Sequence, residues 1–399
     1  MRVVCAPDSF KESMDAGVAA AVMAAAVRRV VPEAECVEIP MADGGEGTTR
    51  ALVAARGGRL VPVAVRDALG RAAVGEIGVA GGRDGEGEHA SGAHASGERG
   101  GSRLGVLEVA SAVGIGMIAR EERDPLAATS VGVADLVRAV LDEGAARLVV
   151  GLGGSATNDG GSGLLVGLGA VLRDAAGAVV PPVPARLGEV ADVDLGGLDP
   201  RLAAVTIELA CDVTNPLLGP TGASAVFGPQ KGASPSDVAL LDGALATFVA
   251  ALEAATGRSV RDVPGAGAAG GLGAAFLALG ARRRRGVDVV IDAVGLDDAV
   301  AGADLVLTGE GSIDEQTLAG KTPAGVAEVA ARHGVPVVAF AGRVAPGADV
   351  LLEHGFTAVV PIVHEVGPLS AVLADGEANL ARAVATAVRL LVSPALRRG

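Results

Sequence analysis

The sequence predicts an α/β protein built on parallel β-sheets, because two kinds of segment alternate along most of the chain. Short apolar runs recur between stretches of about 12 to 20 residues that have the apolar period of an amphipathic helix. This alternation is typical of parallel βαβ units. The length of 399 residues adds a second inference, since single hydrophobic cores stop growing beyond roughly 250 to 300 residues. We therefore expect two or three domains.

The expected elements follow from the apolar pattern. Strands are expected at residues 3–6, 36–40, 104–109, 148–152, 205–210, 287–291, 305–308, 335–341 and 358–361. Clear helical periods occur at residues 16–31, 130–143, 238–256 and 323–333. Loops that leave the carboxyl ends of parallel strands line the binding crevice of such folds, so motifs in these loops carry the most weight.

Two stretches depart from the alternation. Residues 81–102 have no apolar period and no branched aliphatic side chain, so we expect a flexible excursion. His89 and His94 lie in it, and solvated loop histidines are a better interpretation than a metal site. The basic run at residues 282–285 is interpreted as a solvated helix end.

Composition excludes several classes of partner. A net charge of −14 repels phosphate backbones, and only 2% of residues are aromatic, so nucleic acid is not expected as a partner. The three cysteines, Cys5, Cys36 and Cys211, are widely spaced, which suggests neither a disulfide framework nor a zinc site. No uninterrupted apolar run reaches about 18 residues, so no membrane span is expected. A cytoplasmic protein fits these features.

Lysine is scarce, and each lysine lies in an unusual loop. Of the 33 basic residues only Lys11, Lys231 and Lys321 are lysines. A lysine kept against such a bias can serve as a compact point charge that the planar guanidinium of arginine does not reproduce. Chance retention is the alternative for any one of them.

The first loop, residues 6–13, lies between the opening strand and the first helix. Ser9 or Ser13 can cap that helix, and Lys11 can reach an anion at the helix amino end.

The second loop, residues 42–49, has three glycines in four positions, which allows a ligand to approach the backbone closely. Asp43 and Glu46 can hold a hard cation or accept a proton. A tight turn before a capped helix is the alternative.

The third loop, residues 151–163, directly follows a strong apolar strand. Six of its thirteen residues are glycine, which suits a cradle of backbone amides around phosphate groups.

Two further loops supply charged and amide groups. Residues 309–322 end in Gly320-Lys321-Thr322, but the first glycine of a P-loop would fall at Glu315, so the Walker pattern fails and Lys321 opens a helix instead. Residues 211–232 supply an acid, an amide and a lysine. Carboxylates, lysines and glycine cradles without a Cys–His pair favour phosphoryl transfer, which needs positioning, charge neutralisation and a proton acceptor.

At these residues the sequence resembles the bacterial-type glycerate kinases, which phosphorylate glycerate with ATP. The blocks that carry the resemblance are APDSFKESMDA from Ala6, ADGGEGT from Ala42, GLGGSATNDGG from Gly151, CDVTNPLLGPTGA from Cys211, FGPQKGA from Phe227 and ADLVLTGEGSIDEQTLAGKTP from Ala303. Three features depart from the family: Ser312 stands in place of a frequent Arg, Ala134 in place of a usual Gly, and the excursion is longer.

The resemblance implies a two-domain α/β fold. A flavodoxin-like, Rossmann-type domain would come from both chain ends, residues 1–80 and 300–399. A second α/β domain at 104–299 would be inserted in the middle, after the glycine-rich excursion at 81–103. The active site would lie between the domains. MgATP would be the donor and D-glycerate the acceptor, with 2-phosphoglycerate favoured over 3-phosphoglycerate as the product.

Roles can be assigned within that expectation. The candidate catalytic residues are Lys11, Asp43, Asp212, Lys231 and Lys321. The nucleotide would be held by Gly153, Gly154, Ser155, Thr157, Asn158, Asp159, Gly160 and Gly161. Substrate contacts would come from Ser9, Gly44, Gly45, Asn215, Gln230, Glu310 and Asp314. Asp43 and Glu46 are the expected Mg²⁺ ligands, and the choice of general base among Asp43, Glu46 and Asp212 stays open.

An NAD-dependent oxidoreductase is the main alternative. Gly151, Gly153 and Ala156 fit a relaxed dinucleotide fingerprint, and Asp174 lies at a suitable distance along the chain to meet a ribose hydroxyl. This reading accounts for the third loop alone. A nucleotide-binding module without catalytic activity is a further alternative.

Overall fold

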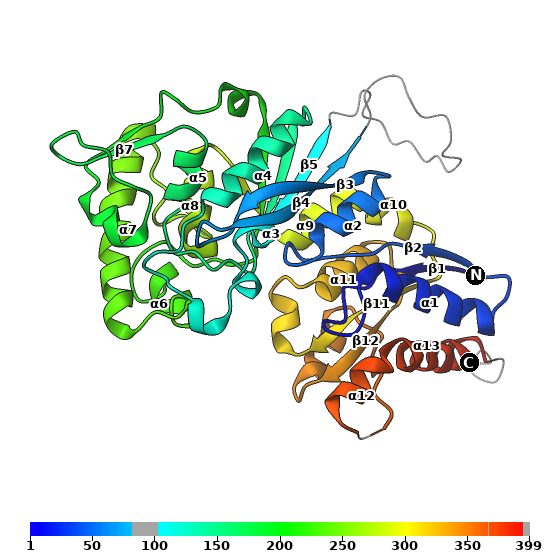
Figure 1. The fold of residues 1–399 in the computed structure, drawn as a ribbon. Helices are drawn as coiled ribbons and strands as arrows, with labels where there is room; N and C mark the ends of the chain where they lie inside the picture. The colour runs from blue at the N-terminus through cyan, green and yellow to red at the C-terminus, as the bar shows by residue number, and fades with distance from the viewer. Residues whose placement is uncertain (82–102, 366, 394–399) are drawn as a thin grey trace. The chain divides into compact units, whose positions relative to one another are not determined.

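The structure, a computed structural model, describes residues 1–81, 103–365 and 367–393 (Figure 1). The stretch expected to be a flexible excursion, with His89 and His94, lies outside the described residues except for Gly81. The chain forms two compact units, Met1–Asp43 with Arg285–Gly399, and Gly44–Arg284. The units divide after residues 43 and 284, whereas the sequence analysis placed the changes near residues 80 and 300.

The first unit holds a five-stranded sheet in the order β13-β12-β11-β1-β2, and every neighbouring pair is parallel. The strands are β1 (Arg2–Cys5), β2 (Glu35–Glu38), β11 (Leu305–Ile313), β12 (Val337–Val344) and β13 (Ala358–Pro361). Counted in chain order within this unit, the sheet reads 2-1-3-4-5, which is the flavodoxin-like order. The expected flavodoxin-like sheet is therefore confirmed. Its topological switch point lies between β1 and β11.

Helices of the first unit pack on this sheet. They are α1 (Ala16–Val30), α9 (Gly286–Val294), α10 (Leu296–Val300), α11 (Thr322–Arg332), α12 (Leu369–Ala374) and α13 (Gly376–Val392), with 3₁₀ turns at Glu315–Ala319 and Ala348–His354. Buried Val3 and Phe340 of the sheet join Met23 of α1 and Val384 of α13 in one apolar cluster. With Ala-rich helices and few aromatic residues, the core is filled mainly by small and branched aliphatic side chains.

Two local expectations in this region are wrong, for different physical reasons. Asp15, rather than Ser9 or Ser13, caps α1, since its carboxylate accepts a hydrogen bond of 2.8 Å from the Val18 amide. Residues 287–291, expected as a strand, lie in α9. An apolar run of five residues cannot distinguish a buried strand from the buried face of a helix.

The second unit holds a six-stranded sheet in the order β10-β9-β6-β5-β4-β3. Its strands are β3 (Arg59–Arg66), β4 (Ala72–Ala80), β5 (Leu104–Glu108), β6 (Arg147–Gly151), β9 (Thr206–Ala210) and β10 (Arg282–Arg284). The four strands from β10 to β5 are parallel, whereas β4 and β3 are antiparallel. β3 and β4 were not expected, and their pairing places residues 59–80 in the second unit.

The arginine run at residues 282–285 is a helix end only at Arg285, the N-cap residue of α9, because Arg282–Arg284 form β10. As the edge strand of the sheet, β10 pairs with β9 alone, and an edge tolerates long charged side chains. The guanidinium group of Arg284 lies 3.6 Å from the carboxylate of Glu208 in β9.

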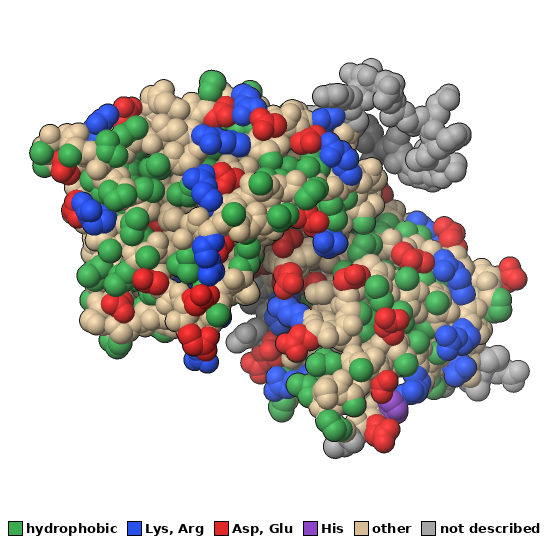
Figure 2. Space-filling view, in the orientation of Figure 1, with side chains coloured by type: hydrophobic (Ala, Val, Ile, Leu, Met, Phe, Trp, Pro, Cys, Tyr) green, Lys and Arg blue, Asp and Glu red, His purple; other side chains and the backbone are tan. Residues whose placement is uncertain are grey.

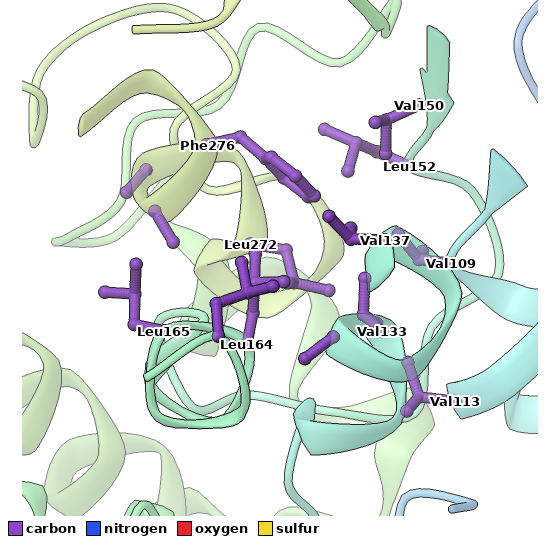
Figure 3. Packing of buried hydrophobic residues seen from close by; sticks show 14 of the residues in the cluster. Val109, Val113, Val133, Val137, Val150, Leu152, Leu164, Leu165, Leu272 and Phe276 are labelled. Atoms are coloured by element: carbon purple, nitrogen blue, oxygen red, sulfur yellow. The ribbon is translucent and has the colours of Figure 1, made fainter. Parts of the chain in front are cut away.

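Helices α4, α5 and α8 enclose the core of the second unit. The helices are α2 (Thr48–Ala55), α3 (Ala110–Val113), α4 (Val131–Asp142), α5 (Ser162–Gly167), α6 (Ala223–Phe227), α7 (Pro235–Thr256) and α8 (Leu272–Ala278), and β7 (Val171–Arg173) pairs with β8 (Asp192–Asp194) in a small separate sheet. The 3₁₀ turns are Ile115–Met117, Arg120–Glu122, Pro184–Glu189, Pro200–Ala204, Pro229–Lys231 and Ala268–Gly271. Figure 3 shows Val137 of α4, Leu164 of α5 and Phe276 of α8 pointing into one apolar cluster.

Helix α7 is long and apolar enough to cross a membrane by length and composition. Six of its side chains, including Leu241 and Phe248, are buried in the core of the second unit. A core helix passes the same test of length and composition. Acidic and basic side chains are intermixed on the face of the molecule seen in Figure 2.

Candidate active site

The first unit gathers acidic side chains at the switch point of its sheet. Asp8 follows β1, and its amide donates a hydrogen bond of 2.8 Å to the carbonyl of Gly309 in β11. The hydroxyl of Thr308 donates to the Ala6 carbonyl at 2.8 Å. These bonds hold the loop after β1 against β11. Crevices outside the carboxyl ends of strands at a switch point are where ligands bind in this class of sheet.

The carboxyl group of Asp8 is 9% exposed by residue and is tightly held. One oxygen accepts a hydrogen bond of 2.6 Å from the Ser9 amide, and the other accepts one of 2.6 Å from the hydroxyl of Thr322. Burial, followed by the charge of Asp43, raises the pKa of Asp8 to about 6. Asp8 was not among the functional residues expected from the sequence, because one acid after a strand has no distinguishing local pattern.

Glu310 lies in β11 and shares this environment. Its carboxylate accepts a hydrogen bond of 3.0 Å from the Thr317 hydroxyl and lies 3.5 Å from the ammonium of Lys321. Burial raises the pKa of Glu310 to about 7, while Lys321 and Thr317 oppose that rise and the charges of Asp8 and Asp43 add to it. Three carboxyl groups, those of Asp8, Asp43 and Glu310, are therefore electrostatically coupled within the first unit.

Lys321 brings positive charge to the same cluster. It is the N-cap residue of α11, and its ammonium lies 3.6 Å from Asp314 and donates to the Ser312 carbonyl at 3.3 Å. Lys11 is exposed in the loop after β1, and Ser9 is half-buried there. A Cβ atom on Gly311 would lie 3.4 Å from the Lys11 amide, so β11 runs close to that loop.

In the second unit, the Gly44–Gly45 and Gly151–Gly153 segments approach each other closely. A Cβ atom on Gly151 would lie 2.8 Å from the Gly44 carbonyl oxygen, and one on Gly153 would lie 3.4 Å from Cα of Gly45. A side chain at residue 151 would therefore push the two backbones apart. Gly44, Gly45, Gly151 and Gly153 serve this contact, and Gly153 and Gly154 are exposed beside it.

Glu108, at the end of β5, fixes the second loop and was missed by the sequence analysis. Its carboxylate accepts hydrogen bonds from the amides of Thr49 at 2.8 Å and Gly47 at 3.3 Å, at the amino end of α2. Burial raises the pKa of Glu108, and the charge of exposed Glu46 adds to that effect. The available signal was an acid that ends an otherwise apolar strand run.

Most of the remaining third loop is buried. Ser155, Thr157, Asn158, Asp159, Gly160 and Gly161 are all buried in the second unit. The carboxylate of Asp159 accepts hydrogen bonds from the amide and hydroxyl of Ser130, both at 2.7 Å, and from the amides of Gly161 and Gly163. Burial raises the pKa of Asp159. The carboxylate thus supports the loop from inside, whereas Gly153 and Gly154 present backbone to solvent.

Lys231 is a buried lysine that contacts the third loop. It is 2% exposed, and its ammonium donates to the Thr157 carbonyl at 2.6 Å and to the Ser155 hydroxyl at 3.1 Å. Burial lowers the pKa of Lys231 to about 7, although the charge of Asp159 opposes this. Its role in the structure is to anchor the loop.

The other candidates of the second unit lie nearer the surface. Asp212 is half-buried just after β9, whose carboxyl end is aligned with those of β5 and β6. The side-chain amide of Asn215 donates a hydrogen bond of 2.7 Å to the Thr221 carbonyl, which stabilises the loop that contains both residues. Gln230 is exposed, and its backbone carbonyl accepts a hydrogen bond of 3.0 Å from Arg123.

The acidic side chains of the first unit offer oxygen ligands of the kind that Mg²⁺ prefers. Among the residues that the structure describes, no three His, Cys, Asp or Glu side chains form a group that could hold a metal ion. Mg²⁺ in phosphoryl-transfer sites needs only one or two protein carboxylates, since substrate phosphates and water complete its shell. The coupled carboxyl groups of Asp8, Asp43 and Glu310 meet that smaller requirement.

The dinucleotide alternative fails on geometry. Asp174 follows β7, which belongs to the small sheet with β8, whereas the third loop follows β6 of the six-stranded sheet. In a dinucleotide fold, the acid that binds the ribose follows a strand of the same sheet. The Asp174 carboxylate instead accepts hydrogen bonds of 2.9 Å from the amides of Ala176 and Ala178 in its own turn.

Comparisons with known proteins match nearly the whole chain. Residues 3–392 match the model of the Glycerate kinase family. The chain is 43% identical over 392 residues to a glycerate kinase of Haemophilus influenzae, covering 98% of this chain and 99% of the relative. It is 41% identical over 384 residues to the glycerate 2-kinase of Escherichia coli K12, covering 96% of each.

A solved structure is similar over the same span. The crystal structure described as a glycerate kinase 2 from Salmonella typhimurium LT2 matches with a TM-score of 0.86 at 41% identity, covering 99% of each chain. These relatives match almost end to end, and the family model covers residues 3–392. The chain therefore belongs to the glycerate kinase family, whose named members are phosphotransferases.

Proposed function

We propose that this protein transfers the γ-phosphoryl group of MgATP to a hydroxyl group of D-glycerate, with the 2-hydroxyl favoured as the acceptor. Membership of the glycerate kinase family supports the reaction class. The name of the Escherichia coli relative, a glycerate 2-kinase, supports the position of transfer. The coupled carboxyl groups of Asp8, Asp43 and Glu310 beside Lys321 are the observation that carries the proposal.

The acidic cluster offers a proton acceptor with a suitable pKa. A general base works best when its pKa lies near the working pH, and the pKa values of Asp8 and Glu310 are raised to about 6 and about 7. We assign proton acceptance to this pair in place of the earlier candidates Glu46 and Asp212. The proton leaves the glycerate hydroxyl as its oxygen bonds to the γ-phosphorus and ADP departs.

Charge neutralisation is assigned to the remaining groups. Asp43 is the first candidate to hold Mg²⁺, with Glu46 as the second, and the ion would neutralise phosphate charge when bound with ATP. Lys11 and Lys321 would face the transferred phosphoryl group or the glycerate carboxylate. Lys231 would act through the loop that it anchors.

Nucleotide contacts are assigned by exposure. The backbone amides of exposed Gly153 and Gly154 would meet phosphate oxygens, while buried Ser155, Thr157, Asn158, Asp159, Gly160 and Gly161 would hold the loop in shape. Substrate contacts are proposed for Ser9, Gly44, Gly45, Asn215, Gln230 and Asp314. We also propose that the two compact units are the two domains of the enzyme, that it works in the cytoplasm, and that its partners are small molecules.

The decisive experiment combines turnover with product identification. Purified protein is incubated with ATP, Mg²⁺ and D-glycerate, ADP release is followed, and the product is identified by phosphorus NMR. ADP release that requires glycerate, with phosphorus coupled to the single proton on C2, is the expected result. L-Glycerate and a reaction without Mg²⁺ are the matched controls. Absence of glycerate-dependent ADP release would refute the proposed reaction.

A further inference from the structure

A pocket of about 400 Å³ lies in the second unit, and Gln230 is the one proposed substrate contact among the residues that line it. It is lined by Arg120, Arg123, Pro229, Gln230 and Gly232. No acidic side chain contributes to its lining, although Asp and Glu outnumber Lys and Arg by 47 to 33 in the chain. The lining of the pocket therefore carries two positive charges and no negative charge.

Neither arginine of the pocket is neutralised by the protein. Among the residues that the structure describes, Arg120 is exposed and forms no ion pair, and Arg123 forms none either. One terminal nitrogen of the Arg123 guanidinium donates a hydrogen bond of 3.0 Å to the Gln230 carbonyl, while Nε of Arg123 is buried without a hydrogen-bond partner. A buried donor without an acceptor costs free energy, so an acceptor supplied by a ligand would be favoured there.

Two of the three acidic neighbours in the sequence, Glu122 and Asp124, are engaged elsewhere, and the third, Glu121, is exposed and does not line the pocket. Glu122 pairs with Arg71 at 3.2 Å, and Asp124 accepts hydrogen bonds from the amides of Leu126 and Ala127. The two guanidinium groups thus remain available for an oxyanion. Guanidinium groups bind carboxylate and phosphate well, because their planar donors match the spacing of two oxygens.

The pocket wall is also the turn that carries Lys231. The turn Pro229–Lys231 lines the pocket through Pro229 and Gln230, and the next residue in the chain, Lys231, reaches into the protein to Ser155 and Thr157 of the third loop. Gly232 closes the turn at φ 101°, where a Cβ atom would lie 3.1 Å from the Arg123 carbonyl. A ligand that holds this turn would therefore hold the anchor of the glycine-rich loop.

We propose that this pocket binds a small oxyanion, a phosphate or a carboxylate, through Arg120 and Arg123, and that the bound anion steadies the third loop through Lys231. The anion can come from the reactants of the proposed kinase or from a separate solute, and both share the chemistry that the pocket recognises. The proposal concerns binding alone. Binding without phosphoryl transfer would preserve it and would refute only the proposed function.

Calorimetric titration of the full chain with inorganic phosphate tests the pocket. We expect saturable binding that weakens as chloride is added, since a solvent-open charge pair is screened by salt. Arg120→Gln should weaken binding by about tenfold, the loss expected when a charge-assisted hydrogen bond is removed. Arg138→Gln, which removes the same charge from an exposed position on α4, should bind as the wild type does. Equal affinity in all three proteins would overturn the proposal.

Two further measurements extend the test. Competition by ATP or by D-glycerate identifies the source of the anion, and binding that neither displaces indicates a separate solute. Amide hydrogen exchange at residues 153–157 should slow when phosphate is bound, and Lys231→Met should abolish that slowing while leaving phosphate affinity within about threefold. Unchanged exchange on binding would refute the coupling to the loop. Arg123 also donates a hydrogen bond to the Gln230 carbonyl, so Arg123→Gln can change stability as well as binding. Thermal unfolding of that variant is therefore measured alongside its phosphate affinity. The affinity of Arg120→Gln decides whether the proposal holds.

Discussion

The hydroxyl of Thr322 donates a hydrogen bond of 2.6 Å to the carboxyl group of Asp8, although 314 residues separate them in the chain. Asp8 follows β1, and Thr322 opens α11, which comes after β11. The bond joins the loop after β1, at the switch point, to the amino end of α11. It holds a carboxyl group with a pKa of about 6 where the sheet topology favours ligand binding.

Replacing Asp8 by Asn should reduce kcat by about 10² to 10⁴, the usual contribution of a proton acceptor, while the protein remains folded. Asparagine keeps an oxygen for the Ser9 amide but loses the negative charge. Steady-state kinetics and circular dichroism measure the two effects. Asp349→Asn, at an exposed position in the same unit, is the control and should leave turnover unchanged. Turnover close to that of the wild type would remove Asp8 from the mechanism.

Glu310 should make stability depend on pH. Its folded pKa of about 7 lies above the unfolded value of 4.5, so the folded state binds more protons between those pH values. This contribution to the free energy of unfolding therefore falls as pH rises from about 4.5 to about 7. A shift of this size corresponds to roughly 3 kcal/mol.

Glu310→Gln has nearly the same shape and does not titrate. The free energy of unfolding of Glu310→Gln, relative to that of the wild type, should be higher at pH 8 than at pH 5. Urea denaturation at both pH values measures this difference. Parallel stability curves for the two proteins would show that Glu310 ionises normally. The exposed Glu353→Gln is the matched control in the same unit.

Lys231 should have the opposite pH dependence, at higher pH. Burial lowers its pKa to about 7 from 10.5, so the unfolded state binds more protons between those values and this contribution to stability rises with pH across them. The stability of Lys231→Met relative to the wild type should therefore be highest near pH 6 and should fall as pH rises to 10. Thermal midpoints measure this, with exposed Lys11→Met as the control. An identical pH slope in all three proteins would contradict the buried, low-pKa lysine.

Glycines of the third loop should divide into two classes on substitution by alanine. Gly160 has φ +64° and its Cβ atom would lie 2.9 Å from Phe248, so Gly160→Ala should lower the free energy of unfolding by about 2 kcal/mol or more. Gly153 is exposed, and a Cβ atom there meets only Gly45 at 3.4 Å. Gly153→Ala should leave stability within about 0.5 kcal/mol and raise KM for ATP or glycerate. Equal effects on stability would refute this division.

The apolar pattern located the parallel strands well because those strands are buried on both faces. β1 and β6 read as uninterrupted apolar runs, and both were expected within one residue of their observed positions. β3 and β4 were missed because they are antiparallel, carry exposed residues and include Pro62 and Gly75, which weaken a strand pattern. Apolar period alone could not detect them.

The sequence located the candidate loops better than it located their roles. Glycine-rich segments are visible locally, so the Gly44–Gly45 and Gly153–Gly154 backbones were found. Whether a glycine serves a ligand or a tight packing contact depends on residues far away in the sequence. Gly160, for example, is needed because Phe248 packs against it. The raised pKa of Asp8 depends on burial and on Asp43, neither of which a local motif reveals.

The order of the sheet also dictates when each part of the protein can fold during synthesis. β1 lies beside β11, yet the ribosome makes residue 5 about 300 residues before residue 305, which takes on the order of 15 to 60 seconds at typical translation rates. Residues 44–284 are complete well before β11 and can form their own sheet meanwhile. During that interval β1 lacks its β11 partner, so the nascent chain must shield the buried Val3–Cys5 segment until the carboxyl-terminal strands arrive. Within this sheet, β1 and β11 are the neighbouring strands that wait longest for each other.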